Sequence, residues 1–243
     1  MANFWKHVNN VLQEAEIIIE VLDARMVDET RNIELENKVK RFNRKILYVF
    51  NKCDLVNRKS LDKLKNKLKP SVFISSRDKL GTTILKKKIL EMSRGESVTV
   101  GVVGYPNVGK SSLINALSGK GSARTSTESG FTKGMQKIRV DGKILILDTP
   151  GVLPHKEKDV LKHSKTGSLS YEKIKDPETA ALDLILEKKE IIEKHYCIHG
   201  DNEDEILEKI AIKLRKLQSG GVPNLNAAAC ALLKDWQTGK IKV

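Results

Sequence analysis

The chain has 243 residues, 40% of them hydrophobic and 5% aromatic, which suffices for a largely aliphatic core in one domain plus a smaller partner. Its formal net charge of +13 favours polyanionic partners, RNA or a ribosomal surface rather than DNA, with a solvated lysine-rich surface as an equal alternative. Three cysteines without paired Cys/His spacing argue against a disulfide framework or a zinc site. The lack of a long apolar run argues against a membrane span, so we expect a cytoplasmic protein without a membrane partner.

Short apolar runs alternate with helical patterns over the first 150 residues. These patterns predict strands at 17–23, 45–50, 71–75 and 97–103, and helices at 32–42, 60–68, 82–92 and 109–117. Asp141 and Gly142 separate the apolar segments 136–140 and 143–147, which predicts a β-hairpin. The alternation indicates an α/β fold with a doubly wound, mostly parallel sheet, to which the hairpin adds one antiparallel edge strand.

The pattern changes near residue 151, where strand signals stop. A polar connector is expected over 152–171. Amphipathic runs beyond it predict helices at 177–193, 203–217 and 226–236. We therefore expect a first domain over residues 1–155 and a helical C-terminal domain over residues 172–243.

A phosphate-binding loop is predicted at residues 104–111, where GYPNVGKS fits GxxxxGK(S/T) between a strand and a helix. Its glycines let backbone N–H groups surround phosphates at a helix N-terminus. Lys110 would neutralise the β- and γ-phosphates, and the Ser111 hydroxyl would bind Mg²⁺. A glycine-rich turn without a ligand is the alternative, which the complete match disfavours.

A second phosphate-sensing motif follows the hairpin. Residues 148–151 (DTPG) fit DxxG, in which the Asp148 carboxylate holds Mg²⁺ through water and the Gly151 N–H senses the γ-phosphate. An ordinary turn would use the same residues, so the position at a strand end carries the assignment. Thr132, in the polar loop between the two motifs, is the preferred switch threonine, with other Ser and Thr residues of that loop as competitors.

A base-reading motif occurs earlier in the chain. Residues 51–54 (NKCD) fit NKxD at a strand end, and Asp54 could accept two hydrogen bonds from guanine N1 and N2, a donor pair that adenine lacks. Ser75 and Ser76, at the next strand end, would supply a backbone N–H to guanine O6. The sequence thus assigns to a guanine nucleotide Asn51, Lys52, Asp54, Ser75, Ser76, Asn107, Val108, Gly109, Lys110, Ser111, Ser112, Thr132, Asp148 and Gly151. Of these, Lys110, Thr132 and Gly151 are the catalytic candidates, and Ser111, Thr132 and Asp148 the Mg²⁺ ligands.

The order of these motifs is the reverse of the usual one. The guanine motifs precede the phosphate loop, an order written G4-G5-G1-G2-G3. All of them follow strand ends, so they can still converge at one edge of one sheet. Cutting one loop and joining the old termini preserves that geometry, and the segment between residues 92 and 97 is the expected join.

The motif set resembles the circularly permuted GTPases of the YlqF/RbgA type. The resemblance also includes Asp23-Ala24-Arg25, Arg31-Asn32 and the tail from Gly220 to Lys240, so it covers nearly the whole chain. It implies hydrolysis of GTP to GDP and phosphate, with Mg²⁺, in the assembly of the large ribosomal subunit, and it favours an archaeal member. A tRNA-modification or translation GTPase normally keeps the unpermuted order.

Three further sets of residues bear on catalysis. Val152 and Leu153 stand where many GTPases place a water-orienting Gln, so the catalytic group must come from elsewhere, and K⁺ held by Asn107 is one option. The alternative for Asn107 is that it is a simple loop residue without a cation. His7 lacks the Gly-His-Met setting of the family and receives no catalytic role. Asp23 and Arg25 are interpreted as an ion pair that fixes the sheet edge.

The two functional hypotheses that remain differ in how readily the protein itself hydrolyses GTP. The leading hypothesis is a GTPase that contacts the large ribosomal subunit or its rRNA; the alternative is a GTP-gated RNA-binding module with little hydrolysis of its own. Four cations expected close together on the helix at 203–217 could contact rRNA phosphates or simply be solvated: Lys209, Lys213, Arg215 and Lys216. The sequence leaves the oligomeric state open.

Overall fold

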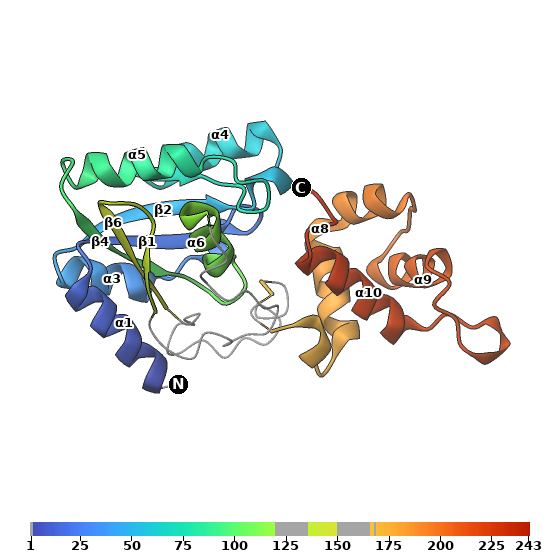
Figure 1. The fold of residues 1–243 in the computed structure, drawn as a ribbon. Coiled ribbons are helices and arrows are strands. Elements are labelled where there is room, and N and C mark those ends of the chain that lie inside the picture. Colours follow the sequence, from blue (N-terminus) through green and yellow to red (C-terminus); the bar gives the residue numbers. More distant parts are fainter. Residues whose placement is uncertain (1, 120–135, 150–165, 168) are drawn as a thin grey trace. The chain divides into compact units, whose positions relative to one another are not determined.

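The computed structural model describes residues 2–119, 136–149, 166–167 and 169–243 (Figure 1). The chain divides into two compact units, Met1–Lys158 and Asp159–Val243. Within the described ranges, no helix combines the length and apolarity that crossing a bilayer requires.

A six-stranded sheet forms the centre of the first unit. Its strands are β1 (Ile17–Asp23), β2 (Lys45–Asn51), β3 (Ser71–Phe73), β4 (Val98–Val103), β5 (Gln136–Arg139) and β6 (Ile144–Asp148). They lie in the order β3-β2-β1-β4-β6-β5, and every neighbouring pair is parallel except the β5–β6 hairpin. The predicted doubly wound, mostly parallel sheet is therefore confirmed.

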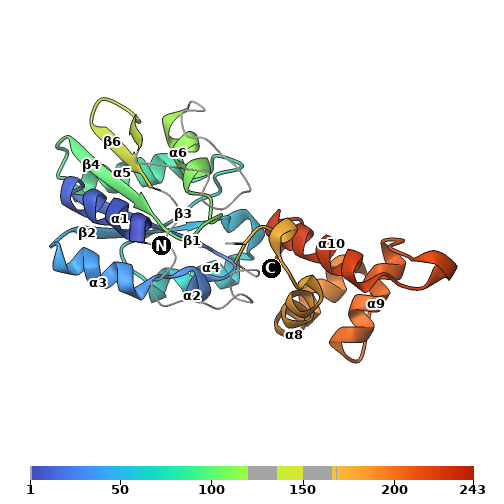
Figure 2. The ribbon, with the colours of Figure 1, turned by 90° about the horizontal axis from the view of Figure 1, so that it is seen from below.

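Helices cover both faces of this sheet. They are α1 (Ala2–Glu14), α2 (Val27–Thr30), α3 (Ile33–Arg41), α4 (Arg58–Lys67), α5 (Thr82–Met92) and α6 (Lys110–Ser118). Alternate residues of β1 face opposite layers: Val21 packs in the cluster with α5 and α6, whereas Leu22 packs in the cluster that α4 borders. Figure 2 shows α6 and α3 on opposite sides of the strands. Because both faces are buried at the centre of the sheet, β1 and β4 are mostly apolar runs rather than alternating ones.

Helix α1 was not predicted, although its sequence carries the necessary spacing. Val8, Val11, Leu12 and Ala15 recur at helical intervals and are buried against β1, β4 and α3. The close approach depends on Gly101 of β4, where an added Cβ would lie 2.3 Å from Val11 Cγ1. The structure thus adds one helix to the layer that supports the strand leading into the glycine loop.

Two predicted elements end earlier than expected. Strand β3 stops at Phe73 rather than residue 75, because the chain turns there and Ser75 pairs with Leu80 in an isolated bridge. The helix predicted over 203–217 is α9 and stops at Lys213. Arg215 adopts a left-handed φ of 52°, and the Lys216 N–H bonds back to Ala211 O over 2.8 Å, which together close the helix.

The second unit is a small helical bundle. Its helices are α8 (Pro177–Tyr196), α9 (Glu203–Lys213) and α10 (Leu225–Gln237), with short 3₁₀ turns at Tyr171–Lys173 and Ser219–Gly221. Each helix begins at an Asp or Asn whose side chain accepts an N–H three residues later: Asp176, Asn202 and Asn224. The buried hydrophobic residues are aliphatic apart from Tyr196 and the fully buried Trp236.

Candidate functional site

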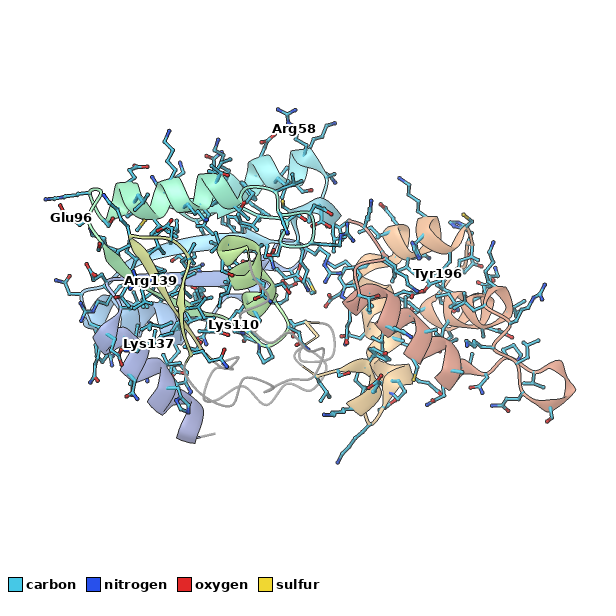
Figure 3. All side chains as sticks on the ribbon, viewed as in Figure 1. Arg58, Glu96, Lys110, Lys137, Arg139 and Tyr196 are labelled. Atoms are coloured by element: carbon cyan, nitrogen blue, oxygen red, sulfur yellow. The ribbon has the colours of Figure 1, made fainter. Side chains whose placement is uncertain are left out.

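The sequence motifs meet at one edge of the sheet, where the parallel strands end. Asp23 and Asn51 are register partners at the ends of β1 and β2. Val102 and Asp148 are partners at the ends of β4 and β6. This edge lies at the carboxyl ends of the parallel strands, where open α/β sheets bind their ligands. Lys110 lies beside it at the start of α6 (Figure 3).

The glycine loop between β4 and α6 has backbone angles that few other residues adopt. Gly104 has φ 147°, and an added Cβ would lie 2.5 Å from Val21 O of the neighbouring strand. Asn107 and Gly109 have φ values of 60° and 96°. The loop is thus held against β1 and turned so that α6 begins directly after it.

Lys110 is buried inside this loop. Its Nζ donates to Gly104 O over 3.0 Å and to Tyr105 O over 2.7 Å. Burial lowers the pKa of Lys110 to about 8, an effect that the nearby carboxylate of Asp148 opposes. An anionic phosphate in the loop would restore the full positive charge of this amine.

Asn51 joins the base-reading motif to the phosphate loop. Its Nδ2 donates to Val108 O over 2.9 Å, although the two residues are 57 positions apart. A Cβ at position 109 would lie 2.3 Å from the same Nδ2 atom, so only glycine fits there. The two motifs therefore lie in direct contact despite their reversed order in the chain.

The other side of Asn51 contacts the segment after β3. Asn51 Oδ1 accepts hydrogen bonds from the Ser76 N–H over 3.2 Å and the Ser76 hydroxyl over 2.8 Å. Ser75 is fully buried, and its hydroxyl bonds to Asp78 within the turn that follows. The Ser76 N–H expected to meet guanine O6 thus already has a partner, because Asn51 fills the space between the two strand ends.

Asp54 carries an ion pair that the sequence did not reveal. Arg77 Nη2 lies 2.9 Å from Asp54 Oδ2; the Asp54 side chain is 12% exposed and the Arg77 side chain 60%. The position of Arg77 directly after Ser76 was the available signal, but the pairing itself depends on how the two strand ends align. Guanine donors approaching Asp54 would share or displace this guanidinium.

Lys52 rests on a fully buried carboxylate at the end of β1. Asp23 accepts Arg25 Nε over 3.0 Å and Arg25 Nη2 over 2.8 Å, and Lys52 Nζ lies 2.8 Å from Asp23 Oδ2. Burial favours the neutral acid, yet the two positive charges hold the pKa of Asp23 well below its usual range. The expected Asp23–Arg25 ion pair is present, and the sequence missed that it also positions Lys52.

Asp148 is a buried carboxylate at the end of β6. The residue is 1% exposed, and neither carboxylate oxygen has a hydrogen-bond partner among the described residues. Burial raises the pKa of Asp148 to about 6, which the charge of Lys110 partly offsets. Two carboxylate oxygens without a hydrogen-bond partner within the described residues fit a hard cation with oxygen ligands such as Mg²⁺.

Comparison with known proteins agrees with this geometry. The RsgA GTPase family matches residues 28–156, more than half of the chain. The chain belongs to this family and is a circularly permuted GTPase. The 50S ribosome-binding GTPase family matches residues 99–215.

Relatives of this GTPase are found in archaea and eukaryotes. An uncharacterized GTP-binding protein of Methanocaldococcus jannaschii is 41% identical over 246 residues, covering 97% of this chain and 65% of the relative. Nuclear GTP-binding protein NUG1 of Saccharomyces cerevisiae is 30% identical over 283 residues, covering 97% of this chain and 54% of the relative. The chain thus spans about half to two thirds of the length of these relatives.

A solved structure shares the fold of this GTPase. The GNP-bound YlqF from T. maritima has a TM-score of 0.70 at 26% identity, covering 99% of this chain and 95% of that one. The expected resemblance to the YlqF type is therefore confirmed.

Some expected site residues of the GTPase fall outside the described residues: Thr132, Gly151, Val152 and Leu153. Ser111 and Ser112 are in the first turn of α6, the former half-buried and the latter exposed. Across the described ranges, no three His, Cys, Asp or Glu side chains gather as a metal cage.

Proposed function

We propose that this GTPase binds GTP with Mg²⁺, hydrolyses it to GDP and phosphate, and acts on the large ribosomal subunit during its assembly. The observation that carries the proposal is the contact of Asn51 with Val108 and Gly109, which holds the base-reading and phosphate motifs against each other. The family model described as 50S ribosome-binding GTPase supports the ribosomal part.

Selectivity for guanine rests on Asp54. In the proposed complex its carboxylate accepts the N1 and N2 donors of guanine, while Lys52, fixed by Asp23, packs beside the base. ATP would leave this partly buried carboxylate facing a base without that donor pair, which costs about 1–3 kcal/mol. Arg77 would hold the Asp54 carboxylate in place until the base arrives.

The phosphate end rests on Lys110, Ser111 and Asp148. Mg²⁺ would neutralise developing charge on the phosphates, and Asp148 and Ser111 would hold it. Lys110 would exchange its two loop carbonyls for phosphate oxygens. Thr132 and Gly151 are proposed to sense the γ-phosphate, and Asn107 to hold K⁺ where other GTPases place a cationic side chain.

The proposal is tested by nucleotide binding and single-turnover hydrolysis. We expect GTP to bind roughly 5- to 150-fold more tightly than ATP, as a cost of about 1–3 kcal/mol implies, and hydrolysis to accelerate with purified large ribosomal subunits, more in K⁺ than in Na⁺. Gly109→Ala, which drives a methyl group into Asn51, should abolish binding. Gly142→Ala, which meets open space, is the matched control. Equal uptake of ATP and GTP would overturn the proposal.

A second candidate is a GTP-gated RNA-binding module with little hydrolysis. The observation in its favour is the apolar pair Val152-Leu153 after DxxG. Tight GTP binding without acceleration by large subunits, in either cation, would select this candidate over the first.

A further inference from the structure

The net positive charge of this protein belongs to one of its two units. Unit Met1–Lys158 contains 30 Lys and Arg against 17 Asp and Glu, whereas unit Asp159–Val243 contains 14 of each. The entire net charge of +13 therefore belongs to the nucleotide-binding unit. A uniformly lysine-rich composition would have charged both units, so composition alone does not explain the segregation.

Most of that charge is concentrated in a single segment. Residues 57–96 hold 12 Lys and Arg against 4 Asp and Glu, a net of +8. They form α4, the edge strand β3 and α5. Both helices border β3: Leu61 of α4 packs in the cluster of Phe73, and Leu85 of α5 packs in the cluster of Val72.

The cations of this segment are presented to solvent. α4 has no buried residue, and Arg58 extends from it away from the sheet (Figure 3). Among the described residues, ion pairs engage Lys67, Arg77 and Lys88, with Asp28, with Asp54 and Asp78, and with Glu91 respectively. The exposed remainder, here called the β3-edge patch, has no such pair within the described ranges: Arg58, Lys59, Lys63, Lys65, Lys69, Lys79, Lys87 and Arg94.

The chemistry of the patch fits phosphate groups rather than bases. The only aromatic residue in 57–96 is Phe73, and its ring stacks on Phe50 at a centroid distance of 5.0 Å. No ring of this segment is therefore available for a single-stranded base to stack on. Closely spaced lysines without aromatic neighbours match the sugar-phosphate backbone of a duplex, which proteins recognise largely by shape.

The helical unit offers a poorer surface for the same ligand. Lys209 Nζ already contacts His199 O over 2.6 Å and Glu205 Oε1 over 2.6 Å. The first turn of α9 contains three acidic residues, Glu203 to Glu205. The unit contains as many acidic as basic residues, so a polyanion would meet repulsion as well as attraction.

We infer that the β3-edge patch, formed by α4, β3 and α5 of the nucleotide-binding unit, is the surface that docks on double-helical RNA. This inference deepens the proposed function, on which it rests for the ribosomal origin of the RNA. The patch begins beyond Asp54 and includes the segment of Arg77, so the RNA-facing surface and the base-reading motif share one stretch of chain.

The test compares two triple variants of the full chain. The patch variant is Lys59→Gln, Lys63→Gln and Lys87→Gln; the control variant is Lys194→Gln, Lys213→Gln and Lys216→Gln, which removes the same charge from exposed positions of the helical unit. Binding is measured to a generic 20-base-pair RNA duplex and to purified large ribosomal subunits, over a series of salt concentrations. Unchanged GTP affinity checks the folding of both variants.

For the duplex, the patch variant should lose roughly tenfold to a hundredfold in affinity near 0.15 M salt. The slope of the logarithm of the binding constant against the logarithm of the salt concentration should become shallower by about one unit for each lysine removed. The control variant should bind like wild type. Equal loss in both variants, or loss in the control alone, overturns the inference. So does binding of vesicles with anionic lipid in place of the RNA duplex.

The two proposals fail separately. If wild type binds large subunits and accelerates hydrolysis on them, but the patch variant does so equally well, the inference falls and the proposed function stands. If wild type ignores large subunits yet binds the duplex through the patch, the ribosomal function falls and the RNA-docking surface stands.

Discussion

Asp148 is a buried carboxylate that has no hydrogen-bond partner among the residues that the structure describes. Burial raises its pKa to about 6 from the ordinary value of 3.8. The unfolded chain releases this proton near pH 4 and the folded chain only near pH 6. Stability from this residue is therefore full below pH 4 and is lost as the pH rises to 6. A bound cation would remove that cost.

We expect Asp148→Asn to stabilise the nucleotide-free protein by about 1 to 3 kcal/mol at pH 7.5 and to change little at pH 4. The same variant should lose Mg²⁺-dependent GTP binding. Urea unfolding at both pH values and binding with and without Mg²⁺ measure the two effects. Asp62→Asn, at an exposed position of α4, is the control. A destabilised variant at pH 7.5 would contradict the assignment.

Glu20 of β1 is another buried carboxylate of the first unit. It is fully buried, accepts the Asn32 N–H over 2.8 Å through Oε1, and has no partner at Oε2 within the described residues. Burial raises its pKa to about 8. The unfolded chain ionises near 4.5, so stability from Glu20 falls as the pH rises from 4.5 to 8.

Replacing Glu20 by Gln should remove that part of the pH dependence. The free energy of unfolding of wild type is expected to fall by a few kcal/mol more than that of Glu20→Gln between pH 5 and 8. Guanidinium unfolding at several pH values provides the measurement. The exposed Glu96, changed to Gln, should leave the wild-type slope intact. Parallel curves for wild type and Glu20→Gln would refute a buried neutral acid.

Single residues of the motifs were predictable, whereas their partners were not. Asn51, Lys110 and Asp148 stand out because local chemistry requires each type at that spacing. The contacts of Arg77 with Asp54 and of Lys52 with Asp23 depend on strand register and side-chain direction. Those quantities follow from the packed sheet, and no short stretch of sequence encodes them.

Among the elements, α1 and β4 are fitted to each other at one glycine. An alanine methyl at position 101 would lie 2.3 Å from Val11 Cγ1, 3.0 Å from Ile18 Cδ1 and 3.3 Å from Ala15 Cβ. The helix can therefore approach the strand only because position 101 has no side chain. A change there acts on the packing of the whole helix rather than on backbone strain.

Gly101→Ala should destabilise the protein by about 1–3 kcal/mol through overpacking. Combined with Val11→Ala, which removes the nearest methyl groups, the cost should be smaller than the sum of the two single costs by at least about 0.5 kcal/mol. Urea unfolding of the four members of this cycle gives the coupling. Additive costs would show that α1 does not press on position 101.

The elements themselves were predicted where apolar runs are β-branched or strongly periodic, as in β1 and α5. The spacing that marks α1 was present but lies within a mostly polar stretch. The early end of α9 depends on the left-handed conformation of Arg215, a residue type that gives no such signal. Tertiary packing against Leu35 and Val103 stabilises α1 where intrinsic propensity alone does not.

At the scale of the whole molecule, the two units have separate cores. The first is centred on the sheet, and the second on residues such as Leu184, Ile210, Leu232 and Trp236 of α8, α9 and α10. The base-reading, phosphate and Mg²⁺ residues that the structure describes all belong to the first unit. A ligand that binds to the folded first unit therefore stabilises that unit against unfolding.

Calorimetric unfolding is therefore expected to show two transitions. A non-hydrolysable GTP analogue with Mg²⁺, at a hundredfold excess over its dissociation constant, should add about 2.7 kcal/mol to one of them and leave the other in place. Gly109→Ala should abolish the shift while retaining both transitions. A single transition that moves as a whole would contradict independent unfolding.

The permuted order was predictable because it does not depend on packing details. Motifs that follow parallel strands arrive at the same sheet edge whatever their sequence order, provided that the connections keep their handedness. The prediction therefore needed only the strand ends at residues 51, 103 and 148. How the charge divides between the units was also readable from the sequence, once the boundary between them was known.

The hydrogen bond from Asn51 to Val108 has a consequence for biosynthesis. As the chain leaves the ribosome amino end first, β1, β2 and β3 emerge before the loop that would grip the phosphates. The nascent chain must therefore fold β1, β2 and β3, with the base-reading motif, through its own contacts. The stacked rings of Phe50 and Phe73 are one such contact, and it forms before the phosphate loop is available to bind a nucleotide. In an unpermuted relative the phosphate-binding loop is translated before the base-reading motif. The residues that bind the nucleotide phosphates are therefore synthesised early in that order and late in this one.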